Sequence, residues 1–314
     1  MTVLCRPSMF RSATAILIVA FLGVAAQSRL AWAQACCASA GLIAPTRLRS
    51  YEDFAVGAAG RVRSVFGAFD INGRYDGMRA GESEWSLEQD LFGAARVFQR
   101  GQVAIVLPFI ETRRHLSGSA STGGGVGDVA VHGRYDFMHA GEHRLVPGVA
   151  VLFGLVAPTG TPPEETTDLW AAGATGQGSW QGSLGIGLEQ GFEPYFITLN
   201  ALGTLRSSRT IVGVGESSFA PRLTGILAVG RVLPRTATVG VFISGMSQGD
   251  NSGDQGRIAG SGSSLLTAGL AATISPTDQW RLQGTLSTNV PVAGWGRSQT
   301  AGAGVSLSII RLWP

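Results

Sequence analysis

The clearest structural signal in the chain is the stretch Asp128-Val129-Ala130-Val131-His132-Gly133-Arg134-Tyr135-Asp136-Phe137. Its odd-numbered residues are apolar, aromatic or glycine, whereas its even-numbered residues are mostly polar. Successive side chains of a β-strand point to opposite faces, so this stretch predicts a strand with lipid on one face and water on the other. On a helix the same apolar residues would scatter around the axis and form no stripe.

Alternation of the same kind recurs along most of the chain. It is less clean in the segments 53–66, 84–98 and 145–157, the last of which is apolar on both faces. The strands that the pattern predicts cover residues 53–66, 84–98, 103–115, 127–138, 145–157, 180–190, 194–206, 219–233, 236–247, 264–275, 280–290 and 300–313.

The connections between these segments alternate between short and long. The long ones, such as 116–126, 158–179 and 248–263, are rich in Gly, Ser, Thr and Asp. Bacterial outer-membrane barrels have short periplasmic turns, long external loops and an even number of strands. The sequence therefore predicts an all-β fold, a transmembrane antiparallel up-and-down β-barrel of about 12 strands with both termini in the periplasm, although ten or fourteen strands also fit. A soluble β-sandwich or propeller is the alternative, and it would need a charged outward face on each strand.

The composition agrees with a lipid-facing β structure. Of the 314 residues, 45% are hydrophobic, only 14% are charged and 45 are glycine, whereas soluble domains carry about 25% charged residues. Every basic residue is Arg, and three of the 24 lie in the first 33 residues, which contain no acid. The remaining 24 − 3 = 21 arginines balance the 21 acids. Because the arginines are scattered and form no patch, we expect no nucleic-acid partner.

The N-terminus has the features of an export signal. Arg6 and Arg11 precede the apolar run 13–26, and Ala31-Trp32-Ala33 is typical of a cleavage site. We therefore expect a signal peptide over residues 1–33, a periplasmic N-terminal segment over 34–52 and the barrel over 53–314. Cys36 and Cys37 follow the cleavage site, where either a vicinal disulfide or lipidation of Cys36 is conceivable, and their role stays open. The body of the chain contains no Cys, and no motif in it indicates a cofactor or a metal.

Residues 125–178 carry a recognisable order of motifs. Gly125-Val126-Gly127-Asp128 opens a strand that contains Arg134-Tyr135, Pro158-Thr159-Gly160 ends the next strand, and Gly176-Gln177-Gly178 lies in the following loop. This order resembles a family of outer-membrane transporters associated with the meta-cleavage pathway of phenol degradation. The resemblance implies a membrane barrel that transports small, aromatic or hydrophobic solutes. The motifs themselves are interpreted as structural, since glycine and proline mark strand ends.

Strand parity predicts which side chains face the lumen, and their charges are mixed and nearly balanced. Ion pairs that stiffen the barrel and a polar constriction crossed by a solute explain these residues equally well. The candidates for lining the lumen are Arg61, Arg63, Glu88, Asp90, Arg96, His132, Arg134, Asp136, Glu189, Asn200, Arg206, Arg222, Arg281, Gln283 and Asn289.

Three functional hypotheses follow. The preferred one is a channel or transporter for passive movement of small solutes across the outer membrane, not an enzyme, with the lipid bilayer, the solute and the barrel assembly machinery as partners. The second is a plugged structural or binding barrel that presents external loops. The third is an outer-membrane lipid hydrolase that uses His115 and Ser117, which would share one strand face.

Overall fold

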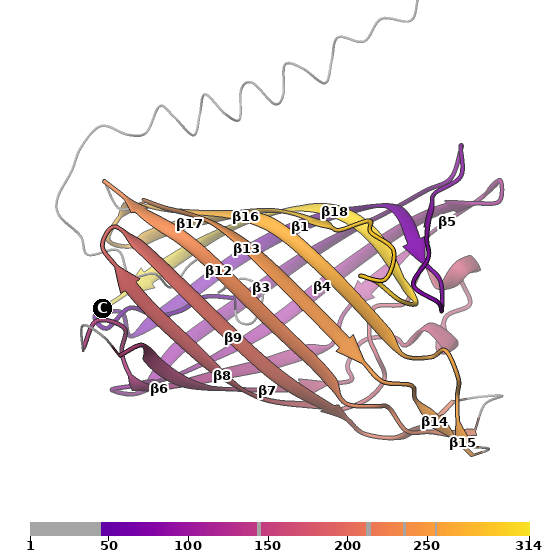
Figure 1. Ribbon diagram of the computed structural model, residues 1–314, viewed down its shortest axis with the longest axis horizontal. Helices are drawn as coiled ribbons and strands as arrows, with labels where there is room; N and C mark the ends of the chain where they lie inside the picture. Colours follow the sequence, from indigo (N-terminus) through magenta and orange to yellow (C-terminus); the bar gives the residue numbers. More distant parts are fainter. Residues whose placement is uncertain (1–44, 143–145, 212–214, 235–236, 255) are drawn as a thin grey trace, which may run out of the picture.

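Twelve long antiparallel strands form the wall of the protein in the computed structural model, which describes residues 45–142, 146–211, 215–234, 237–254 and 256–314 (Figure 1). The predicted signal peptide, its cleavage site, Cys36 and Cys37 lie outside the described residues. The twelve strands of the wall are β1 (Phe54–Phe69), β3 (Ser83–Phe98), β4 (Gly101–Leu116), β6 (Val129–Met138), β7 (Gly148–Ala157), β8 (Gln181–Phe192), β9 (Tyr195–Arg206), β12 (Arg222–Leu233), β13 (Ala237–Gln248), β16 (Ser263–Thr277), β17 (Trp280–Asn289) and β18 (Gln299–Trp313).

The sheet closes because the first and last strands of the wall pair with each other. β1 and β18 are antiparallel from Phe54 opposite Trp313 to Phe69 opposite Gln299, with one bulge near Val65. Phe54 and Trp313 also bring their rings together at the start of this seam, with centroids 5.5 Å apart. A closed sheet has no free edge, so its backbone groups are paired within the wall, which a membrane interior requires. The predicted fold class and strand number are confirmed.

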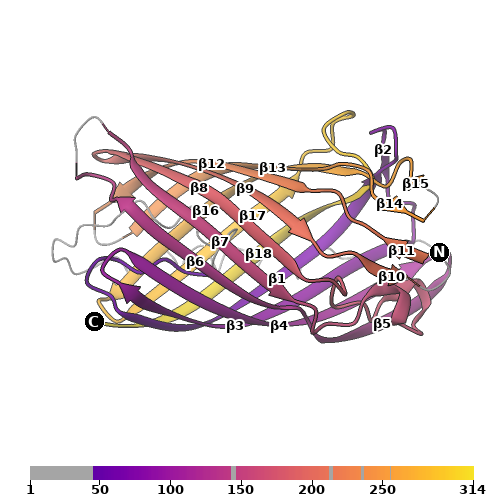
Figure 2. The same cartoon turned by 90° about the horizontal axis from the view of Figure 1, so that it is seen from below.

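Short turns gather at the end of the barrel that carries the C-terminus, and the remaining secondary structure gathers at the opposite end (Figures 1 and 2). By the rule for outer-membrane barrels, the end with short turns is periplasmic and the other is external. The elements of the external end are β2 (Tyr75–Gly77), β5 (Ser119–Val126), β10 (Arg209–Ile211), β11 (Gly215–Ser217), β14 (Ser252–Gly253), β15 (Gly256–Arg257) and the 3-10 helices η1 (Pro163–Glu165) and η2 (Leu169–Ala171). Among the described residues, no helix is long and apolar enough to cross a membrane.

One predicted external loop, 116–126, is instead a β-hairpin arm. β4 continues to Leu116, turns at Ser117 and Gly118, which both have positive φ, and pairs with β5 back to Val126. The Gly- and Ser-rich composition of this segment is typical of a loop, but backbone pairing with the end of β4 makes it extended. β6 then takes over as the partner of the inner part of β4.

The two faces of the wall differ as the alternation predicts. Leucines of the outward parity are among the most exposed large side chains of the long strands, with Leu184 66% and Leu205 and Leu223 each 65% exposed. The inward neighbours are polar and buried, for example Asn200 at 5% exposed. An apolar outer face around a polar interior is the arrangement of a membrane barrel and the reverse of a soluble sandwich.

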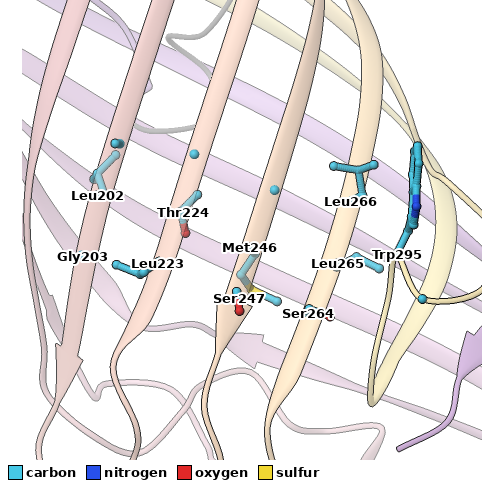
Figure 3. A pocket seen from close by; sticks show the side chains of 14 residues that line it. Leu202, Gly203, Leu223, Thr224, Met246, Ser247, Ser264, Leu265, Leu266 and Trp295 are labelled. Carbon is cyan, nitrogen blue, oxygen red and sulfur yellow. The ribbon is translucent and has the colours of Figure 1, made fainter. Parts of the chain in front are cut away.

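Small residues make one hollow in this wall near the external end. Gly203, Gly225 and Gly245 lie on the outward parity of β9, β12 and β13, and they line a hollow of about 590 Å³ together with Leu223 and Trp295 (Figure 3). An added Cβ would meet nothing within 4 Å at Gly225. Packing therefore does not require a glycine there.

Candidate functional site: the barrel lumen

The described part of the N-terminal segment, residues 45–52, lies in the periplasmic mouth of the barrel. Its side chains at Thr46, Leu48, Arg49 and Glu52 are at most 5% exposed. The segment 34–52 was expected to be periplasmic; its described end is at the periplasmic end of the molecule but is enclosed by the wall. It joins the wall directly, because Asp53 N donates a hydrogen bond of 2.9 Å to the Trp313 carbonyl.

Leu48 anchors the segment to the wall by apolar contact. It belongs to a buried cluster with inward-facing residues of β1, β3, β4 and β18, among them Phe92 and Ile310. Gln102 on β4 fixes the backbone beside it, since its Oε1 accepts from Leu48 N at 2.9 Å and its Nε2 donates to the Thr46 carbonyl at 3.3 Å. Burying one leucine side chain contributes about 1.5–3 kcal/mol.

A buried ion pair holds the end of the segment. Arg281 on β17 is 0% exposed and donates to the carboxylate of Glu52, to the Arg47 carbonyl at 2.9 Å and to Thr46 Oγ1 at 3.4 Å. The other oxygen of Glu52 accepts from Arg49 N at 2.8 Å. Arg96 on β3 donates to the backbone carbonyls of Arg49 and Glu52. The segment is therefore tied to both β17 and β3.

A second cluster of charges reaches the segment from β6 and β8. The Arg47 guanidinium contacts the carboxylates of Glu189 and Asp136, the latter at 3.4 Å. Arg134 donates to Asp136 Oδ1 at 2.7 Å and lies 3.8 Å from Glu189. Two arginines and two carboxylates thus share one buried network, in which each charge has an opposite partner.

Little space is left around the segment in this mouth. Beside Arg47 and Leu48, between β3, β4 and β6, the remaining gap is about 10 Å³, which is about the room that one water needs. Farther round the wall, Phe196 and Phe242 face inward and pack with Ala228 and Ala271 in a second apolar cluster.

A cavity of about 310 Å³, lined by both polar and apolar residues, lies next to the segment, with Pro45 in its lining. Arg61 and Asp90 line one side of it, and Gln283 and Asn289 line another. Arg61 lies 2.7 Å from Glu88 and 3.9 Å from Asp90. This cavity is large enough for a small solute and offers it hydroxyl, amide and charged groups.

The structure places the predicted lumen residues in four groups. Arg96, Arg134, Asp136, Glu189 and Arg281 contact the N-terminal segment or its charge network. Around the cavity lie Arg61, Arg63, Glu88, Asp90, Gln283 and Asn289, with Arg63 bonded to the Thr300 carbonyl at 2.8 Å and Asn289 to Thr267 Oγ1 at 2.8 Å. His132 and Asn200 lie on β6 and β9, beside glycines of β7 and β8 and away from this cavity. Arg206 and Arg222 lie at the external ends of β9 and β12. Whether these residues contact a solute stays a prediction.

Sequence reasoning missed the segment itself. Arg47, Arg49 and Glu52 precede the first strand and show no alternation, so nothing marked them as part of the lumen. The signal that was available is their charge, because three ionisable residues next to a membrane strand need partners or water.

At the external end, the motif residues of 125–178 come together around Asp128. Its carboxylate accepts hydrogen bonds from Gly160 N at 2.9 Å and from Gln177 N at 2.7 Å. Thr159 Oγ1 donates to the Gly127 carbonyl at 2.7 Å. A Cβ at Gly176 would lie 2.4 Å from Asp128 Oδ1, so only glycine fits there. The motif attaches the loop after β7 to the junction between β5 and β6.

His115 and Ser117, the candidates for lipid hydrolysis, lie near the tip of the β4–β5 arm. His115 Nδ1 is 2.8 Å from the Gly81 carbonyl, and Ser117 forms the turn, with its backbone N bonded to Glu82 Oε1 at 3.3 Å. Both residues thus have contacts that explain them structurally.

Comparison with known proteins places this barrel in a family. Residues 83–309, more than half of the chain, match the family described as "Putative MetA-pathway of phenol degradation". The chain belongs to this family. No curated protein matches the sequence.

Solved structures agree on the fold. An outer-membrane channel from Pseudomonas putida F1 is similar with a TM-score of 0.68 at 13% identity, over 85% of this chain and 100% of that one. The translocator domain of the autotransporter NalP from Neisseria meningitidis has a TM-score of 0.49 at 10% identity, over 96% and 95% of the two chains. The CymD monoaromatic hydrocarbon channel has a TM-score of 0.40 at 7% identity, over 83% and 89%. The first of these likenesses confirms an outer-membrane barrel fold.

Proposed function

We propose that the protein is a passive outer-membrane channel for small solutes, closed at its periplasmic mouth by residues 45–52. The observation that carries the proposal is the division of the lumen. A cavity of about 310 Å³ directly adjoins a segment of the chain that is held by side-chain contacts and not by pairing in the sheet. A segment held in this way can leave the mouth without unfolding the wall.

Aromatic or hydrophobic solutes are the class that membership of the phenol-degradation family supports. The outward movement of a product and the uptake of a growth substrate are equivalent for such a channel, since passive transport follows the concentration gradient in either direction. The similar structures named as channels are in keeping with this role.

The test compares the refolded mature chain, residues 34–314, with a chain that lacks residues 34–52. Liposome swelling with a small neutral sugar reports the opening of the lumen. We expect slow swelling for the mature chain and fast swelling for the truncated chain. Equal and negligible swelling for both, with heat-modifiable folded barrels on gels, would instead support the second candidate, a plugged barrel that presents its external loops to a partner.

A further inference from the structure

The arginines inside the barrel differ in their partners between its two ends. Near the periplasmic end, the guanidinium groups of Arg47, Arg134 and Arg281 each contact a carboxylate. At the external end, Arg206 and Arg222 have no carboxylate within ion-pair distance among the described residues. Removing water from a guanidinium without supplying an anion is unfavourable, so a pair of such groups calls for a ligand.

Arg206 and Arg222 are neighbours on the inner face. Arg222 lies opposite Thr204 on the neighbouring strand, and Arg206 is two residues farther along that strand. The two arginines are therefore diagonal neighbours on the same face of adjacent strands. Arg222 Nε contacts Gln248 Oε1 at 3.4 Å, a neutral partner. Leu205, between Thr204 and Arg206, is 65% exposed on the outer face, which places Arg206 on the lumen side.

Phe219 gives the site an apolar side. The Arg206 guanidinium lies 4.5 Å from the centre of the Phe219 ring, and the Arg209 guanidinium lies 5.8 Å from it. Arg209 is paired with Glu164 of the loop after β7, so its charge is already balanced. A guanidinium that lies over a ring face keeps its N–H groups in its own plane, where their outer edge is free to bind an anion.

Two buried hydroxyl groups next to this cluster have no partner among the described residues. They belong to Ser179 and Ser217, each 2% exposed. Ser217 is the ladder partner of Arg209, and Ser179 lies between Gly178, which faces the Arg209 guanidinium, and Trp180, which is bonded to Ser207. The Nε atoms of Arg206 and Arg209 are also buried without an acceptor. Buried donors are nearly always satisfied, so four together indicate a missing acceptor.

We propose that Arg206 and Arg222, with Phe219 and the hydroxyls of Ser179 and Ser217 beside them, form a binding site for a small aromatic carboxylate at the external end of the lumen. A carboxylate offers two oxygens that match the fork of a guanidinium, and an aryl group finds the apolar side at Phe219. The inward parity of both arginines favours a solute over a lipid phosphate. The inference deepens the proposed channel function and rests on it for the solute's further path.

The test is equilibrium binding of benzoate to the refolded mature chain in detergent micelles, measured by titration calorimetry. We expect benzoate to bind and benzamide, its neutral counterpart, to bind at least about tenfold more weakly, since hydrogen bonds from a guanidinium to a carboxylate are stronger than those to a neutral amide. The double variant Arg206→Gln, Arg222→Gln should lose about tenfold in affinity for each charge removed. The control Arg113→Gln removes an exposed charge from the outward parity of β4 and should bind benzoate like the unaltered chain.

Three results would overturn the proposal: no binding of benzoate to the unaltered chain, equal binding of benzoate and benzamide, or equal affinity in the double variant and the control. The comparison with benzamide needs no variant, so the proposal remains testable if the double variant fails to fold. Because binding in micelles does not require conduction, a protein that binds benzoate but stays closed contradicts the channel function alone. A protein that conducts without binding contradicts only this site.

Discussion

The substitution Glu52→Gln tests whether the N-terminal segment closes the channel. Glu52 is 2% exposed and is the carboxylate partner of Arg281, which is 0% exposed. Glutamine has nearly the same shape but no charge, so the Arg281 cation stays buried without its counter-ion while the segment is in place. When the segment leaves the mouth, water reaches Arg281. The substitution therefore penalises the closed state and not the open one.

The size of the effect follows from the burial of the pair. Removing one partner of a buried ion pair costs about 3–5 kcal/mol. Since about 1.4 kcal/mol corresponds to a factor of ten in an equilibrium constant, the ratio of open to closed molecules should rise by about 100-fold or more. A channel that is open in about 0.1% of molecules would then be open in about 10%.

The neighbouring residue offers a matched control. Asp53 also pairs with an arginine, Arg96, at 3.2 Å, but its side chain is 66% exposed. Exposed pairs contribute about 0–1 kcal/mol, so Asp53→Asn should change the open fraction little. Single-channel recording in planar bilayers at physiological salt measures the open fraction of both variants. If Glu52→Gln opens no more often than Asp53→Asn while both barrels fold, the segment is a fixed part of the wall and the reasoning is refuted.

Two further predictions concern the external end. Gly176→Ala places a Cβ 2.4 Å from Asp128 Oδ1 and should destabilise the barrel by about 1–3 kcal/mol. Gly182→Ala, whose Cβ would have nothing within 4 Å, should leave the stability unchanged. Denaturant unfolding followed by tryptophan fluorescence measures both variants, and equal shifts of the unfolding midpoint would contradict the role given to the motif. The hydrogen bond from Gly262 N, together with the Arg257 guanidinium, holds the pKa of Asp250 below its usual 3.8, so the carboxylate stabilises the loop above that pH and stops doing so as the pH falls through the lowered pKa. Protection of the backbone amides of residues 256–262 against hydrogen exchange, measured relative to the intrinsic exchange rate at each pH, should therefore be high at neutral pH and fall in strong acid. Asp250→Asn should lose this protection already at neutral pH, and equal protection in the variant and the unaltered chain at neutral pH would contradict this.

The wall was predictable because it is set by local rules. A membrane strand must alternate, and a one-residue slip would place every polar side chain in lipid. The strand predicted at 194–206, for example, begins one residue before β9 and ends at the same residue. The same parity predicts that Arg206 and Arg222 face the lumen.

The contents of the lumen were not predictable in this way. Leu48 is apolar and stands between two arginines, which in a single sequence resembles any solvated tail. Its partners on β1, β3, β4 and β18 come from both ends of the chain. Such contacts depend on the closure of the barrel and not on local periodicity. The arm 119–126 was missed for a related reason, because its glycines have weak strand propensity and its extension is imposed by β4.

The way the segment is attached explains how a few contacts can close a channel. Residues 45–52 continue directly into β1, so the segment that leaves the mouth remains tethered at its rim and returns from a high effective concentration. The closed fraction is therefore set by the contacts of Leu48, Arg47 and Glu52 and not by the amount of protein. Those contacts lie at the end of the barrel opposite Arg206 and Arg222. A solute held at the external end thus has no direct contact with the closing segment, and its binding and the opening of the mouth are separable steps that substitutions at the two ends can change one at a time.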